Sequence, residues 1–147
     1  MRHIFTIALF TAVMALTSCG MEIETSGNGD LDGFWNLTQV DSTATGVTAD
    51  VHEQRLFWSV QHKLLQLSDY QNQNPMCLLR FEKNGQQLTL SSPFFYNRDE
   101  GDQPIDDISV LAPYGINAMP ETFQIQKLNS SKMVLKTDIV TLYFTRF

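Results

Sequence analysis

The sequence is poor in the residues that most site chemistry needs. It holds two cysteines and three histidines among 147 residues, too few for a disulfide framework or a four-cysteine zinc site. Sixteen acids against ten bases exclude a nucleic-acid binder that works by neutralising phosphates. The motifs of P-loop, dinucleotide-binding and Gly-x-Ser-x-Gly enzymes are also missing. The length and the 43% hydrophobic content indicate one ordinary globular domain.

The N-terminus predicts export. Arg2 and His3 precede an uncharged apolar run over residues 4–16, shorter than the ~20 residues that a membrane-spanning helix needs. The run ends at Leu16-Thr17-Ser18-Cys19, which resembles a bacterial lipobox. The resemblance implies that residues 1–18 are a signal peptide, removed before Cys19, and that Cys19 carries the lipid that anchors the protein. An ordinary cleaved signal, in which Cys19 has no role, is the alternative.

Residues 19–32 are small, polar and acidic, as expected of a flexible tether between lipid and domain. Loss of Arg2 with the signal peptide leaves nine bases against sixteen acids, a net charge of −7. With Cys19 lipidated, Cys77 is the remaining thiol. Its apolar neighbours predict a buried, inert side chain rather than a nucleophile.

The pattern of residues 33–147 predicts short antiparallel strands in a single domain. Apolar and polar residues alternate in runs bounded by turn residues, and little of the chain has the helical period. Asn84-Gly85 lies between two such runs and predicts a type I′ hairpin turn. In the run 55–67 the apolar parity flips near Leu64, which indicates either one bent strand or two strands.

A long segment, residues 92–120, interrupts the strands with four prolines and an acidic cluster. A connection of this length is rarely idle in a compact domain, so we expect it to cover one end of the fold. Antiparallel sheets of this size avoid exposed edges by closing on themselves. The predicted fold is therefore all-β, an antiparallel up-and-down barrel of about seven or eight strands, with a β-sandwich as the alternative.

Gly33-Phe34-Trp35 at the start of the first strand resembles the Gly-x-Trp signature of lipocalins, and nearly the whole mature chain is similar to small lipocalin-like lipoproteins of Bacteroidetes. The resemblance implies a lipocalin-like barrel in an outer-membrane lipoprotein. It also implies that Trp35 packs across the closed end, with Arg146 against its ring, a contact worth ~1–2 kcal/mol if desolvated. Such relatives mostly lack an assigned activity, so the resemblance supplies a fold and a location but no reaction. The matching pieces are Leu31-Asp32-Gly33-Phe34-Trp35, Phe57-Trp58, Arg80-Phe81, Lys127-Leu128-Asn129, Lys132-Met133-Val134-Leu135 and Leu142-Tyr143-Phe144-Thr145-Arg146-Phe147.

Candidate ligand-binding residues are apolar side chains whose strand parity points inward: Trp58, Val60, Leu79, Phe81, Phe123 and Ile125. An eight-stranded barrel has room for one small ligand or for a filling of side chains, and so many large residues keep both alternatives open. His52 and His62 have no third ligand nearby, so no metal site and no cofactor are predicted. The acidic run at residues 99–107 lacks the spacing of a calcium loop and predicts a solvated loop.

Two functions follow from these patterns, and an enzyme is not expected because no acid–base constellation converges in the sequence. The first is a lipid-anchored binder of a small apolar or amphipathic ligand, held under residues 92–120. The second is a non-catalytic structural or interaction subunit of an outer-membrane complex, with a packed barrel and an aromatic or acidic outer face. The membrane, reached through the lipid on Cys19, is the predicted partner in both; the periplasmic and surface faces both stay open.

Overall fold

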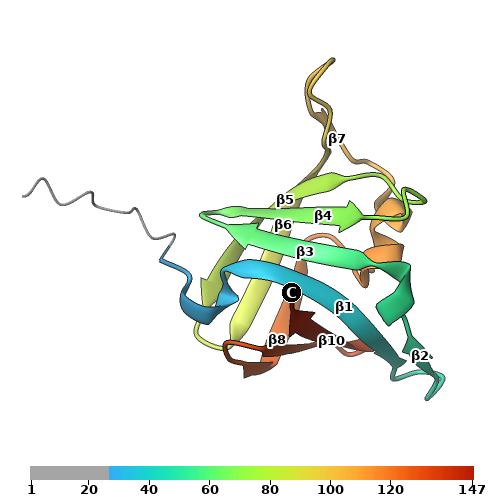
Figure 1. Ribbon diagram of the computed structural model, residues 1–147, viewed down its shortest axis with the longest axis vertical. Helices are drawn as coiled ribbons and strands as arrows, with labels where there is room; N and C mark the ends of the chain where they lie inside the picture. The colour runs from blue at the N-terminus through green and yellow to red at the C-terminus, as the bar shows by residue number, and fades with distance from the viewer. Residues whose placement is uncertain (1–26) are drawn as a thin grey trace, which may run out of the picture.

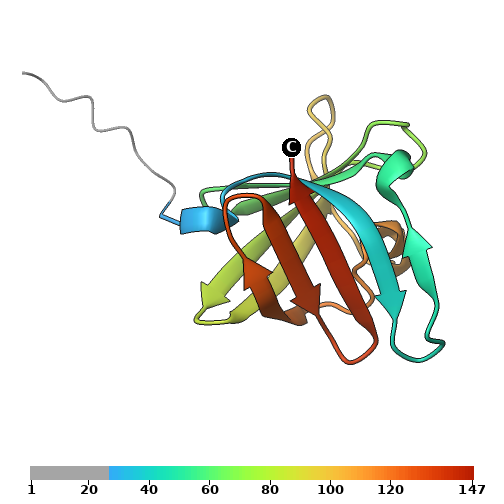
Figure 2. The same cartoon turned by 60° about the horizontal axis from the view of Figure 1, so that its bottom comes forward.

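The computed structural model describes residues 27–147, which form a closed antiparallel barrel (Figures 1 and 2). Strands follow the order β1-β3-β4-β5-β6-β8-β9-β10, and β10 pairs back with β1, so no long free edge is left. The barrel confirms the predicted fold and excludes the sandwich. The strands are β1 Gly33–Ser42, β3 Leu56–Gln61, β4 Leu64–Asp69, β5 Cys77–Asn84, β6 Gln87–Phe95, β8 Glu121–Leu128, β9 Lys132–Lys136 and β10 Val140–Arg146.

Two short strands pair with the ends of barrel strands. Strand β2 (Thr48–Asp50) pairs with the end of β1, and β7 (Gln103–Pro104) pairs with the end of β6. Three 3₁₀ helices complete the described chain: η1 (Gly29–Leu31), η2 (His52–Gln54) and η3 (Ile108–Tyr114). In this part of the chain no helix has the length and apolar character needed to cross a membrane.

A tight turn explains the parity flip near Leu64. Gln61 pairs with Leu64 across a two-residue turn, so the run forms two strands, β3 and β4, rather than one bent strand. His62 occupies the turn with a positive φ of 54° and is exposed, although an unbroken strand would have pointed it inward.

The β5–β6 hairpin differs from its prediction by one residue. Asn84 and Gln87 are paired, so the turn is centred on Gly85-Gln86. Only Gly85 has a positive φ, at 61°, whereas a type I′ turn needs one at both central residues. The hairpin prediction is confirmed, and its turn type and centre are wrong.

Helix η1 covers one end of the barrel. Its Leu31 is fully buried, and the carbonyl of Leu31 accepts a hydrogen bond from the indole N–H of Trp35 at 2.9 Å. The guanidinium carbon of Arg146 lies 4.4 Å from the centroid of the Trp35 ring. Its nitrogens donate to the carbonyls of Asp32 at 2.6 Å and Asp30 at 2.5 Å. One arginine thus joins the last strand, the first strand and the helix that precedes it.

Gly33 makes this arrangement possible. A Cβ atom there would lie 2.2 Å from Nη1 of Arg146, and the residue has a φ of +139° that side chains rarely allow. The folded unit begins near residue 28, because the Asn28 side chain donates to Asp32 and to the carbonyl of His62, and η1 follows directly. Residues 28–32, predicted to belong to the tether, are therefore part of the folded unit.

The long proline-containing segment is only in part the cover that its length predicts. Residues 92–104 continue β6 and return through β7, a hairpin that projects away from the barrel (Figure 1). Residues 105–116 close the end opposite η1, where Leu111, Tyr114 and Ile116 are fully buried. The prediction is therefore confirmed for the second part and wrong for the first.

Substitution of Gly33 should be far more costly than substitution of a turn glycine. Gly33→Ala combines a strained φ with a clash against Arg146 and should lower the free energy of unfolding by about 3–5 kcal/mol. Gly85→Ala, which meets no atom within 4 Å, is the matched control and should cost about 1–2 kcal/mol from its φ of +61° alone. Urea unfolding of both variants measures the difference, and equal losses would contradict the role of Arg146.

Candidate functional site

The centre of the barrel is filled by side chains. The ring of Trp58 lies 4.8 Å from that of Phe144 and 5.8 Å from that of Phe123, both in edge-to-face geometry. A void as wide as a water molecule would leave accessible surface on the side chains that line it. Trp58, Phe123 and Tyr114 have none, so no cavity adjoins them.

Five of the six candidate ligand-binding residues are therefore core residues. Strand parity predicted their inward direction correctly, but in place of a ligand they meet one another and the residues that enter from η3. Of the two alternatives that the sequence left open, a ligand cavity and a filling of side chains, the described residues show the filling. Their exposed fractions are Trp58 0%, Val60 5%, Leu79 1%, Phe123 0% and Ile125 7%.

Tyr114 is the residue that completes this filling. Its carbonyl accepts a hydrogen bond from the indole N–H of Trp58 at 3.0 Å, and its hydroxyl donates to the carbonyl of Pro75 at 2.9 Å. The Cys77 thiol donates to the same carbonyl at 3.4 Å. Burial raises the pKa of Tyr114 above its ordinary value and that of Cys77 to about 11. Both groups stay protonated at neutral pH, which is opposite to what a nucleophile needs.

The buried carboxylate of Asp69 organises the loop after β4. It accepts hydrogen bonds from the backbone N–H groups of Gln71 at 2.8 Å, Gln73 at 3.0 Å and Asn74 at 2.9 Å, and from the Asn74 side chain at 2.9 Å. These bonds hold the loop so that Pro75 reaches Tyr114. The carboxylate is fully used for structure, and it lies at the opposite end of β4 from the exposed His62.

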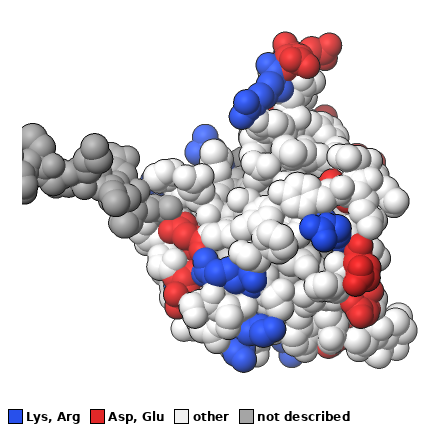
Figure 3. Space-filling model, viewed as in Figure 1, with Lys and Arg blue, Asp and Glu red and all other residues white. Residues whose placement is uncertain are grey.

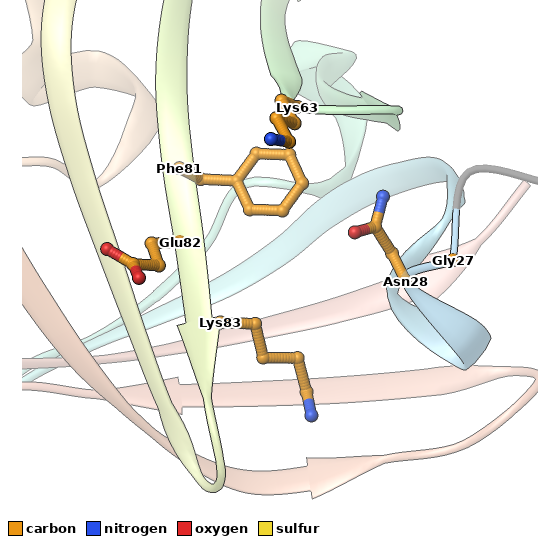
Figure 4. Close-up of a pocket in the computed structure, with 6 residues that line it drawn as sticks. All are labelled: Gly27, Asn28, Lys63, Phe81, Glu82 and Lys83. Carbon is orange, nitrogen blue, oxygen red and sulfur yellow. The ribbon is translucent and has the colours of Figure 1, made fainter.

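Phe81, the sixth candidate, lines a solvent-open hollow at the η1 end of the barrel. The hollow has a volume of about 500 Å³. Figure 4 shows the Phe81 ring projecting from β5 toward η1, with Lys63 and Lys83 on either side and Glu82 directed away. Its lining residues are Gly27, Asn28, Lys63, Phe81, Glu82 and Lys83.

Asn28 holds the wall of this hollow. Its side-chain amide donates to the carbonyl of His62 at 2.6 Å and to the carboxylate of Asp32 at 2.7 Å, which ties η1 to the β3–β4 turn. Among residues 27–147 no lysine forms an ion pair with a carboxylate; the salt bridge present there joins His52 to Glu53 at 3.5 Å. Within this part of the chain, the ammonium groups of Lys63 and Lys83 meet no carboxylate.

A second feature is an aromatic cluster on the outer wall, formed by Phe34, Phe57, Tyr70 and Phe147. Phe34 and Phe57 are stacked with ring centroids 4.5 Å apart, and Phe147 meets both edge-on at 5.7 and 5.5 Å. Tyr70 lies 4.9 Å from Phe57. We call this group the outer aromatic cluster.

The outer aromatic cluster is only partly covered. Phe57 is 1% exposed because the other rings lie over it, whereas Tyr70 is 53% and Phe147 74% exposed. Figure 3 shows mostly uncharged surface over the middle of β1 and β3. An aromatic or acidic outer face was expected from the sequence, without assignment of its residues. Phe34 and Phe57 directly precede Trp35 and Trp58 in their strands, so their side chains point to the opposite, outer face. This alternation is the sequence signal that could have identified them.

The described part of the chain contains no cluster of side chains suited to metal binding. Residues 27–147 hold no group of three or more His, Cys, Asp or Glu side chains that could bind an ion. His52 lies in η2 and His62 in the β3–β4 turn. In the acidic run, Asp107 caps η3 by accepting from the N–H of Ser109 at 3.0 Å, and the hydrogen bonds with Ser109 lower its pKa.

A model of the lipocalin-like domain matches residues 14–147, nearly the whole chain. The chain belongs to the lipocalin-like domain family. No curated protein matches it.

Solved structures support the same fold. A lipocalin-like protein from Bacteroides uniformis superposes with a TM-score of 0.60 at 18% identity, covering 81% of this chain and 100% of that one. An uncharacterized protein from Bacteroides eggerthii gives 0.58 at 13% identity, covering 79% and 98%. A Burkholderia xenovorans protein solved by NMR gives 0.51 at 13% identity, covering 79% and 82%. At these identities the likeness shows the fold alone.

Removal of Tyr114 should open the space that this lipocalin-like barrel lacks. Tyr114→Phe loses the hydrogen bond to Pro75 and should cost about 1 kcal/mol of unfolding free energy. Tyr114→Ala should cost about 3–5 kcal/mol and leave a void in the place of the buried ring, near Pro75. An apolar fluorescent probe should then bind Tyr114→Ala, but not the wild type or Tyr114→Phe. Saturable one-to-one binding to the wild type, weakened by Trp58→Ala, would contradict the filled interior.

Proposed function

We propose that this protein is a lipid-anchored lipoprotein of the cell envelope that acts as a non-catalytic interaction module. The lipobox-like sequence ending at Cys19 supports the anchor; Cys19 lies outside the described residues. The lipocalin-like barrel supplies a rigid body that carries binding surfaces on its outside. This is the second of the two functions that the sequence left open, with an outer-membrane location.

The observation that carries this proposal is the filled interior together with the outer aromatic cluster. A lipocalin-like fold can hold a small ligand in its barrel, but here Trp58 and Tyr114 occupy that space. On the outer wall, Tyr70 and Phe147 expose aromatic rings to solvent. Clustered exposed aromatic side chains are typical of protein contact surfaces.

The chemistry of the described residues supports a non-catalytic role. The pKa values of Cys77 and Tyr114 are raised by burial, and both side chains are used in one structural network with Pro75. The buried carboxyl group of Asp69 is saturated by hydrogen bonds. The Phe81 hollow, where apolar and basic groups meet, is a surface site at which a small ligand could bind.

The anchor is tested by fractionation of host cells. Cys19→Ala should release the protein from the membrane fraction into the soluble fraction, because the lipid attachment atom is gone. Cys77→Ala is the matched control and should leave the protein membrane-bound, since this thiol is buried inside the barrel. A Cys19→Ala protein that stays fully with the membrane would overturn the anchor.

The interaction surface is tested by site-specific photo-crosslinking in the host. A photoreactive residue placed at Tyr70 or at Phe147 should give one adduct of the same mass, because both positions belong to the outer aromatic cluster. Thr122, exposed on β8 across the barrel, is the control position and should give no such adduct. Equal adducts at Thr122, or none at the two cluster positions, would refute this surface.

A further inference from the structure

The charged side chains of the described residues are divided unevenly between the ends of the barrel. The η1 end, where β1 begins and β10 ends, also contains the β3–β4, β5–β6 and β8–β9 turns. Its bases are Lys63, Lys83, Lys127, Lys132 and Arg146, and its acids are Asp30, Asp32 and Glu82. Arg80, in the middle of β5, lies between the two ends. The opposite end carries Arg55, Arg98 and Lys136 against Asp41, Asp50, Glu53, Asp69, Asp99, Glu100, Asp102, Asp106, Asp107, Glu121 and Asp138.

Among residues 27–147, bases thus exceed acids by a small margin at the η1 end, and acids exceed bases by a large one at the other. The preceding stretch of the chain, which joins the η1 end to Cys19, adds Glu22 and Glu24. In Figure 3 acidic side chains gather at the tip of the β6–β7 hairpin and along the edge beside β2, and others lie at the η1 end, which holds Asp30 and Asp32. A negatively charged surface would attract the η1 end and repel the opposite end. Both effects favour the orientation in which the η1 end faces that surface.

The Phe81 hollow lies at the basic end. Lys63 and Lys83 flank an aromatic ring that is only partly buried, and Glu82 points away from the opening (Figure 4). Two ammonium groups around an apolar ring suit a ligand that joins an anionic group to a hydrocarbon part. A phospholipid headgroup with its glycerol and first methylenes has this composition.

The chain itself brings this end to the bilayer. Gly27 lines the hollow and follows Cys19 by eight residues, a stretch that spans at most ~28 Å even when fully extended. A lipid on Cys19 would therefore hold the η1 end close to the membrane. The acidic end, on the far side of the barrel, would face away.

From this placement we infer that the η1 end docks on the membrane surface and that the Phe81 hollow receives the headgroup of an anionic phospholipid. Lys63 and Lys83 bind the phosphate, and Phe81 contacts the glycerol and the first acyl carbons. The inference rests on the lipid anchor of the proposed function. It leaves the outer aromatic cluster on the side wall, where a protein partner in the envelope can reach it.

The test uses the mature chain from residue 19, with Cys19→Ala, so that no lipid contributes to binding. Phe81→Trp places an indole in the hollow; the native Trp35 and Trp58 are fully buried and give a constant background. Vesicles contain phosphatidylcholine alone, or phosphatidylcholine mixed with phosphatidylglycerol, each with brominated acyl chains that quench nearby indoles. Ile139→Trp, 47% exposed at the acidic end, is the matched control.

The expected result is quenching at position 81 by the mixed vesicles, weakened by salt, with none at position 139. Lys63→Gln and Lys83→Gln should each weaken vesicle binding about five-fold, whereas Lys136→Gln should change it little. Equal quenching at both positions, or equal binding to phosphatidylcholine alone, would overturn the inference. Tight binding of inorganic phosphate at the hollow without vesicle binding would also overturn it and would assign a soluble anion instead. Because the tested chain has no lipid, these outcomes are separate from the fractionation result.

Discussion

The two tryptophans in the barrel carry indole N–H groups that are cut off from water, and each must find an acceptor. Trp35 and Trp58 are paired neighbours on β1 and β3. Trp35 donates to the carbonyl of Leu31 at one end of the barrel, and Trp58 donates to that of Tyr114 at the other. An unpaired buried N–H costs about 1–3 kcal/mol, so each tryptophan favours the presence of the segment that covers its end. The covering segments η1 and η3 are in this sense parts of the core.

This constraint decides where binding can occur. A segment that is hydrogen-bonded to the core, and that buries Leu111, Tyr114 and Ile116 inside the barrel, is not a loose cover over a cavity. Asp69 strengthens the arrangement from outside, since its loop places the Pro75 carbonyl on the Tyr114 hydroxyl. A lipocalin-like barrel closed in this way keeps its shape and has a filled centre, so the contacts that we propose lie on its walls and rims.

The two surfaces that we propose for contact differ in chemistry. The outer aromatic cluster is apolar and lies on the side wall, where the rings of Phe34 and Phe57 support the exposed Phe147 and Tyr70. The Phe81 hollow is basic and lies at the end where the chain enters the fold. Because the two surfaces are on different parts of the barrel, a membrane and a protein partner would not compete.

Local sequence determined the strands and their direction, because a strand presents alternate residues to opposite faces whatever surrounds it. It therefore sufficed to predict the barrel, the inward direction of Trp58, Leu79 and Phe123, and the hairpin near Gly85. It also placed Trp35 and Arg146 in one region through resemblance to the lipocalins. The tertiary structure alone decided the rest. Whether inward residues line a cavity depends on whether Tyr114, more than fifty positions away from Trp58, enters the barrel. The Phe81 hollow and the outer aromatic cluster likewise join residues from strands distant in the chain, and no local pattern records such distances.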